Sequence, residues 1–79
     1  MNIKVLGTGC SRCVSLEKYV RQAVTELGLQ ATVEKEEDIM KIMEYGIMRT
    51  PGLVIDEKVV LSGQLPSVNE LKNLISSHQ

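Results

Sequence analysis

The chain has 79 residues, of which 43% are hydrophobic, with nine Lys and Arg against ten Asp and Glu and only two aromatic side chains. A nearly neutral chain without stacking platforms has no electrostatic or stacking basis for binding nucleic acid or an anionic membrane. No apolar run approaches the roughly 20 residues of a membrane helix, and the N-terminus lacks a basic region followed by an apolar segment. We therefore expect a single small domain, residues 1–79, located in the cytoplasm.

The first elements are a strand and a long helix. Residues 2–6 are largely apolar and rich in β-branched side chains, which is typical of a short buried strand. Residues 7–13 follow, with two glycines and both cysteines of the chain. Residues 11–27 then predict an amphipathic helix that stops at Gly28, a residue favoured just past helix ends. Its apolar face comprises Leu16, Val20, Ala23, Val24 and Leu27.

A second strand and a second helix come next. Residues 31–35 alternate in polarity and predict a strand parallel to the first, because a helix joins the two. We expect the acidic residues 36–38 to open the second helix, since acids in a first turn complement the helix dipole. This helix ends at Gly46, and we expect its methionines, Met40 and Met43, to fill gaps in the core.

The C-terminal part predicts a hairpin and a last helix. Residues 53–55 and 58–62 are two short β-rich runs separated by a polar pair, a pattern that indicates a β-hairpin. Ser67 and Glu70 have the spacing of a capping box and mark the start of the last helix. We expect this helix to fray over residues 76–79.

The predicted order is therefore strand, helix, strand, helix, strand, strand, helix. A mixed four-stranded sheet with helices on both faces is the simplest arrangement that buries all three apolar helix faces.

The two cysteines have C-x-x-C spacing at the start of the first helix. Unpaired backbone amides and the helix dipole favour a thiolate at Cys10, and Arg12 adds a cation nearby. A loop as short as the one between Cys10 and Cys13 makes a poor structural disulfide, because the entropic gain grows with loop length. The spacing alone leaves three interpretations open: a redox pair, a soft-metal site, or two incidental cysteines.

The metal interpretation has a specific precedent. The pattern Gly-x-Gly-Cys-x-x-Cys after a first strand resembles the loop of small heavy-metal-binding domains, which carry Cu(I) on two thiolates. Those domains finish on a strand, whereas this chain finishes on a capped helix. A closed zinc site needs four ligands, and only His78 on the C-terminal tail could supplement the cysteines. We expect no metal and no cofactor other than the cysteine pair, with Cu(I) binding or transfer as the alternative function.

The Thr50-Pro51 dipeptide favours the redox interpretation over the metal interpretation. In the expected element order this dipeptide lies opposite the start of the first helix. There the chain resembles the thioredoxin-fold family, in particular the minimal glutaredoxin-like and thioredoxin-like redox-active disulfide proteins of archaea and bacteria. The resemblance covers residues 2–76 and rests on residues 7–13, residues 50–55 and the Ser62-Gly63 pair.

The resemblance implies a thioredoxin-like α/β fold and a thiol-disulfide oxidoreductase that acts as a small electron carrier. Cys10 would be the nucleophile and Cys13 the resolving cysteine. Pro51 would follow a cis peptide bond, and the backbone of Thr50 would pair with an extended substrate segment. Together with Thr50 and Pro51, the C-x-x-C residues Ser11 and Arg12 complete the expected substrate-binding set.

The resemblance also implies partners, namely a disulfide-containing protein substrate and a reductase as electron donor. The chain departs from the best-known family signatures. Gly9 replaces the Trp of Trp-Cys-Gly-Pro-Cys, and the glutaredoxin sequences Cys-Pro-Tyr-Cys and Gly-Gly-x-x-Asp are absent. An interaction domain whose thiols only sense redox state is a third functional possibility.

Overall fold

The computed structural model describes residues 1–78 and contains seven elements in the predicted order. These are β1 (Asn2–Leu6), α1 (Ser11–Leu27), β2 (Thr32–Glu36), α2 (Ile39–Glu44), β3 (Gly52–Ile55), β4 (Lys58–Ser62) and α3 (Val68–Ser77). The strands form one sheet in the order β2-β1-β3-β4, with β1 and β2 parallel and the other neighbours antiparallel. The predicted mixed four-stranded sheet is confirmed, and the last described element is the helix α3.

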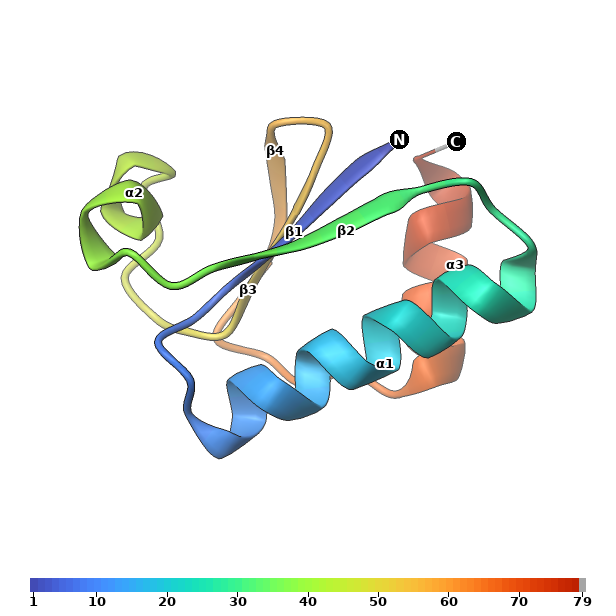
Figure 1. The fold of residues 1–79 in the computed structure, drawn as a ribbon, viewed down its shortest axis with the longest axis horizontal. Helices are drawn as coiled ribbons and strands as arrows, with labels where there is room; N and C mark the ends of the chain where they lie inside the picture. Colours follow the sequence, from blue (N-terminus) through green and yellow to red (C-terminus); the bar gives the residue numbers. More distant parts are fainter. Residues whose placement is uncertain (79) are drawn as a thin grey trace.

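The larger core lies between one face of the sheet and the helices α1 and α3, while α2 lies on the other side of the strands (Figure 1). The predicted apolar face of α1 is buried in this core, apart from a partly exposed Leu27. From the sheet come Ile3, Val5, Leu53 and Ile55, and from α3 come Leu71 and Ile75. The amphipathic periodicity of the two long helices thus determines which sides face the sheet.

The opposite face has a smaller core made of Leu6, Ile42, Ile47 and Val54. The prediction that Met40 and Met43 fill core gaps is wrong, because both are exposed to solvent. With only six residues, α2 makes fewer than two turns and presents a single side, that of Ile42, to the sheet.

The start of α2 also differs from the prediction. Glu36 is the last residue of β2, where it pairs with Leu6, so it does not belong to the helix. Asp38 is the N-cap, and its side chain accepts a hydrogen bond of 2.9 Å from the Met40 N–H. The helix begins at Ile39, and its first turn contains no acidic residue.

The chain reversals follow the sequence closely. Gly28 closes α1 in the left-handed conformation, with φ of 67°, and Ser67 and Glu70 form the predicted capping box. The hairpin turn at Asp56 and Glu57 has positive φ at both residues, as a two-residue type I′ turn requires. The helix α3 continues through Ser77 instead of fraying at residue 76, and the Gln79 part of that expectation lies outside the described residues.

Within residues 1–78, no helix is both long enough and apolar enough to cross a membrane.

Leu16 provides a test of the larger core. Its side chain is fully buried between α1 and the sheet, so we expect Leu16→Ala to lower the free energy of unfolding by about 3 kcal/mol. Urea denaturation measures this change. Lys18→Ala, on the exposed side of the same helix, is the control and should change the value by less than about 0.5 kcal/mol. Equal effects of the two substitutions would contradict the assignment of the core.

Candidate active site

The two cysteines lie where the loop after β1 enters α1. Cys10 is the N-cap, and its Sγ accepts a hydrogen bond of 3.2 Å from the Cys13 N–H. A sulfur therefore takes the place of the oxygen that Ser or Asp usually supplies to the free amides of a helix start. Cys10 is exposed, and Cys13, one turn later, is only 4% exposed.

Cys10 and Cys13 form a disulfide with a Cα–Cα distance of 5.1 Å, within the usual range for this bond. One sulfur of the pair thus belongs to an exposed residue and the other to a buried one. An external thiol or disulfide can approach Cys10, whereas Cys13 is accessible mainly from Cys10. The difference in exposure makes the two cysteines chemically unequal.

Gly7 explains how Cys13 can be buried at this position. A Cβ added to Gly7 would collide with the Cys13 Sγ and would lie 2.7 Å from the Cys13 Cβ. Only glycine lets the end of β1 pass so close to the second sulfur. The sequence prediction treated Gly7 merely as a loop residue. The sequence signal for this close packing was the position of Gly7, directly after a strand and three residues before the first cysteine of the C-x-x-C pair.

Arg12 connects the start of α1 to Gly63, the residue that follows β4. Its Nη2 donates a hydrogen bond of 3.0 Å to the Gly63 carbonyl, and the Gly63 N–H donates one of 2.7 Å to the Pro51 carbonyl. These two bonds bring together the C-x-x-C turn, the loop before β3 and the end of β4. Ser11, the first residue of α1, is exposed beside Arg12.

The loop before β3 contains Thr50 and Pro51, joined by a cis peptide bond. Pro51 is buried and Thr50 is partly exposed. No backbone hydrogen bond joins Thr50 to another of residues 1–78, so its N–H and C=O remain available to an incoming strand. The two hydrogen bonds of Gly63 connect this loop to the C-x-x-C turn.

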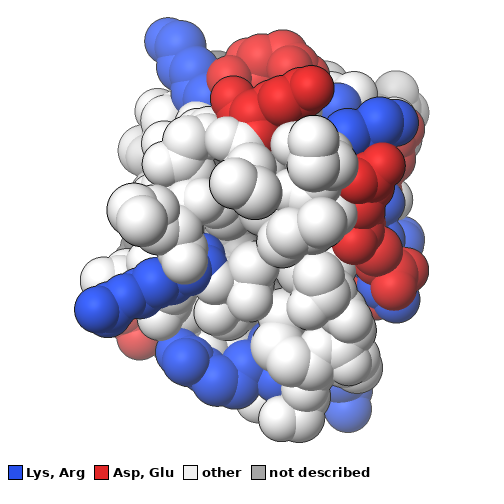
Figure 2. Space-filling model, turned by 90° about the vertical axis from the view of Figure 1, so that its left-hand side faces the viewer, with Lys and Arg blue, Asp and Glu red and all other residues white. Residues whose placement is uncertain are grey.

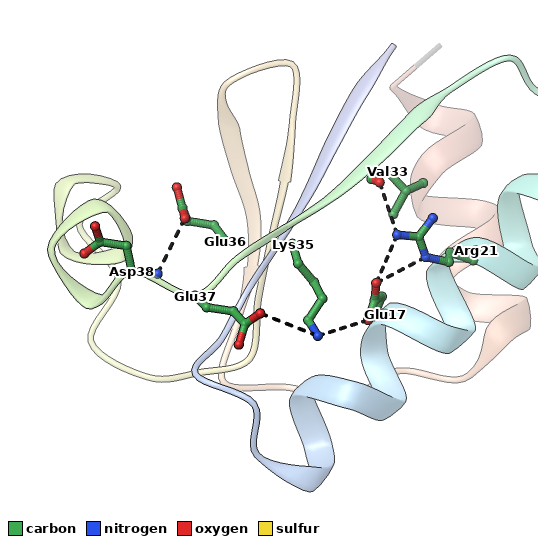
Figure 3. Close-up of polar contacts among 7 residues, drawn as sticks. All are labelled: Glu17, Arg21, Val33, Lys35, Glu36, Glu37 and Asp38. Atoms are coloured by element: carbon green, nitrogen blue, oxygen red, sulfur yellow. Dashed lines mark hydrogen bonds and ion pairs between the residues drawn. The ribbon is translucent and has the colours of Figure 1, made fainter.

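Charged side chains link α1 to β2 on the other side of the disulfide loop. Figure 3 shows Lys35 between two carboxylates, with its Nζ 3.7 Å from Glu17 Oε1 and 3.7 Å from Glu37 Oε1. Arg21 donates to Glu17 Oε2 at 3.0 Å and to the Val33 carbonyl at 3.3 Å. Ion pairs this exposed contribute little stability each, so their main effect is on the local charge.

Glu37 brings negative charge to the disulfide loop. Its Oε2 lies 3.8 Å from the point where a Cβ of Gly9, the residue before Cys10, would be. The loop therefore has a carboxylate on the β2 side and the Arg12 guanidinium on the β4 side. This asymmetry was not visible in the sequence, because it depends on where β2 and β4 end.

A polar hollow of about 400 Å³ lies between α2 and the hairpin, away from the disulfide. Lys4 donates a hydrogen bond of 3.1 Å to the Tyr45 hydroxyl, and this bond, with the nearby Glu57 carboxylate, raises the pKa of Lys4 despite its partial desolvation. Lys4 therefore stays protonated at neutral pH and acts as a cation only. The hollow contains no nucleophile, and its wall mixes both signs of charge: Lys4, Glu36, Lys41, Glu44, Tyr45 and Glu57.

Across residues 1–78 we find no group of three or more His, Cys, Asp and Glu side chains arranged to hold a metal ion.

Comparison with known proteins identifies the family. The family model described as "Thioredoxin domain" matches residues 1–76. The chain belongs to the thioredoxin domain family. The similarity to that family proposed from the motifs is confirmed, and it covers nearly the whole chain.

Three archaeal relatives support the assignment. A thioredoxin of Methanothermobacter thermautotrophicus is 41% identical over 76 residues, which cover 96% of this chain and 99% of the relative. A thioredoxin of Methanocaldococcus jannaschii is 38% identical over 76 residues, covering 96% and 87%. A probable thioredoxin of Archaeoglobus fulgidus is 33% identical over 69 residues, covering 84% and 75%. The regions matched by the first two relatives are long enough to span both cysteine positions and the loop before β3.

Gly7 provides a test of this thioredoxin-family site. We expect Gly7→Ala to lower the free energy of unfolding by about 1–3 kcal/mol, because the new methyl group overlaps Cys13. In the reduced protein, the displaced Cys13 should react with iodoacetamide at a rate closer to that of Cys10. The control is Thr8→Ala, at the exposed neighbouring residue, which should change neither value appreciably. Unchanged stability and an unreactive Cys13 in Gly7→Ala would contradict the close packing.

Proposed function

We propose that this chain is a thiol-disulfide oxidoreductase that reduces protein disulfides and alternates between a dithiol and a disulfide at Cys10 and Cys13. The observation that carries the proposal is the pairing of an exposed N-cap cysteine with a buried cysteine one turn later. Relatives named thioredoxins, similar over almost the whole chain, support the same activity.

In the proposed reaction, the Cys10 thiolate attacks one sulfur of a substrate disulfide. A bond forms between Cys10 and that sulfur, and the other substrate sulfur leaves as a thiolate that takes a proton from solvent. Cys13, after losing its proton, then attacks Cys10 and releases the second substrate thiol. Two electrons pass from the Cys10–Cys13 dithiol to the substrate, and a reductase returns them.

The chain stabilises the charge on Cys10 at the first step. The Cys13 N–H points at the Cys10 sulfur, and this donor and the other free amides of the first turn favour a thiolate there. Arg12 adds positive charge in the same turn. Cys10 attacks first because it is exposed, and the burial of Cys13 reserves it for the intramolecular step.

The substrate segment is proposed to bind in an extended conformation along Thr50, before Pro51, with Ser11 and Arg12 contacting it from the other side of the disulfide. The free backbone groups of Thr50 support this arrangement, because main-chain hydrogen bonds to a strand edge hold a peptide irrespective of its sequence. The buried Pro51 ring supplies no thiol or imidazole that could capture a metal.

The proposed partners are a disulfide-containing protein as substrate and a reductase as electron donor. We propose that residues 1–79 act as one domain in the cytoplasm, where closely spaced cysteine pairs serve redox chemistry. No cofactor beyond the cysteine pair takes part in the scheme.

Two cysteine substitutions test this function. We expect Cys10→Ser to abolish reduction of insulin disulfides, because the remaining thiol of Cys13 is buried, and Cys13→Ser to accumulate a mixed disulfide with substrate, because the resolving thiol is absent. Turbidity and mass spectrometry measure these results. The control, Lys18→Ser, places a serine on the exposed side of α1 and should keep full activity.

Sustained insulin reduction by Cys10→Ser would refute the proposal. Tight stoichiometric Cu(I) uptake by the wild-type protein, without any disulfide exchange, would favour the metal-transfer alternative instead.

A further inference from the structure

A small apolar hollow lies beside the proposed substrate edge. It measures about 250 Å³ and is formed by residues of α2 and of the loop that follows it. We call it the α2 hollow, and it is lined by Ile39, Ile42, Met43, Ile47, Met48, Arg49 and Thr50. Small-molecule sites usually have volumes of about 300–1,000 Å³, so the size of this hollow suits a single side chain better than a free ligand.

The walls of the α2 hollow expose large apolar side chains to water. Met43 is 63% exposed, and Met48 is 98% exposed. Figure 2 shows the face that contains α2, where uncharged side chains form a broad surface. Large apolar side chains exposed around one hollow are typical of a binding surface, and methionines adapt their shape to different partners.

The α2 hollow is continuous with the proposed site. Thr50 belongs to both, since it lines the hollow and presents its free backbone N–H and C=O to the substrate. A peptide that pairs with Thr50 therefore runs alongside the hollow and can place one of its side chains in it.

Two arginines border this region on the β4 side. The Arg12 guanidinium binds the Gly63 carbonyl, and the Arg49 side chain lies so close to Gly63 that an added Cβ there would be 3.0 Å from the Arg49 Cβ. Neither arginine forms an ion pair with a carboxylate of residues 1–78. In Figure 2, basic side chains extend from the lower left edge of the uncharged surface, and both acidic and basic side chains lie along its top and right edges.

We propose that this site selects a substrate segment with two features besides its disulfide: an acidic side chain that contacts Arg12 and Arg49, and an aliphatic side chain such as Leu that enters the α2 hollow. This inference rests on the proposed function and adds the class of substrate. Charge complementarity supports it, because Arg12 and Arg49, which pair with no carboxylate of residues 1–78, attract an acid on the β4 side, whereas on the β2 side Lys35 is already shared by Glu17 and Glu37. The two contacts together fix the orientation of the peptide relative to Cys10.

The peptides that test this contain one cysteine, joined as a mixed disulfide to thionitrobenzoate, whose release is followed by absorbance. The protein is first reduced with dithiothreitol, which is then removed, so that its dithiol supplies the two electrons once and kcat/KM is obtained as the second-order rate constant of this single turnover. Four versions combine Glu or Lys on one side of the cysteine with Leu or Gln on the other, each made in both orders. We expect the Glu/Leu peptide in one order to have the highest kcat/KM. Its kcat/KM should be about threefold that of the Lys/Leu peptide, which is the size of effect that an exposed ion pair produces. It should be about fivefold that of the Glu/Gln peptide, because Leu is partly buried in the hollow.

The outcomes separate the two proposals. Reduction of all versions at equal rates would overturn the selectivity and leave the oxidoreductase function intact. Absence of reduction with every peptide would overturn the function, and the selectivity with it. The Glu-over-Lys preference should also fall at 0.5 M NaCl, because salt screens exposed charges.

Arg49→Glu tests the charge contact. The ratio of kcat/KM for Glu/Leu to that for Lys/Leu should fall from about three to about one in this variant, because the new carboxylate offsets the charge of Arg12. A ratio measured on one protein sample does not depend on the fraction that folds, and Arg49→Gln, which leaves Arg12 alone, should give a value between about one and three. Lys58→Glu makes the same charge change on exposed β4 and should keep the wild-type ratio. A fall of the ratio with Lys58→Glu, or a wild-type ratio in Arg49→Glu, would overturn the contact.

Met43→Gln tests the apolar contact with a closely matched control. Met40 and Met43 lie on the same helix and are similarly exposed, 68% and 63%, but only Met43 lines the hollow. We expect Met43→Gln to remove most of the fivefold preference for Glu/Leu over Glu/Gln and Met40→Gln to retain it. An equal loss in both variants, or a loss in neither, would overturn the assignment of the α2 hollow.

Discussion

Gly63 joins three parts of the chain that are distant in sequence and together surround the disulfide. Its carbonyl accepts a hydrogen bond from Arg12, and its N–H donates one to Pro51. The φ of +72° favours glycine, and a side chain would be in tight contact with Arg49, since an added Cβ would lie 3.0 Å from the Arg49 Cβ. The position of the sulfurs relative to the proposed substrate edge depends on this residue.

The chemical difference between the two cysteines arises mainly from helix capping and burial. Cys10 caps a helix and is exposed, whereas Cys13 is one turn further along and packs against a glycine at the end of β1. In the proposed reaction this difference sets the order of attack. The active site therefore needs few specialised side chains, which is consistent with a chain of 79 residues whose core is small.

The surface beside the proposed site contains apolar side chains that are exposed and arginines that lack acidic partners. Met43 and Met48 are left in water, and Arg12 and Arg49 have no acidic partner within the described residues. Apolar groups and charges without partners contribute little to folding. Departures of this kind from local consistency are expected at functional sites, where another molecule completes the contacts.

The sequence by itself determined the element order, the buried face of α1, the capping box at Ser67 and the pair of cysteines, because periodicity, capping and C-x-x-C spacing are local properties. Only the tertiary structure decided that Glu36 belongs to β2 and that Met43 is exposed. The first depends on pairing with β1, and the second on how much of the sheet a six-residue helix can cover. It also decided the contact between Gly7 and Cys13, because close approach across the fold depends on non-local packing, which no local pattern records.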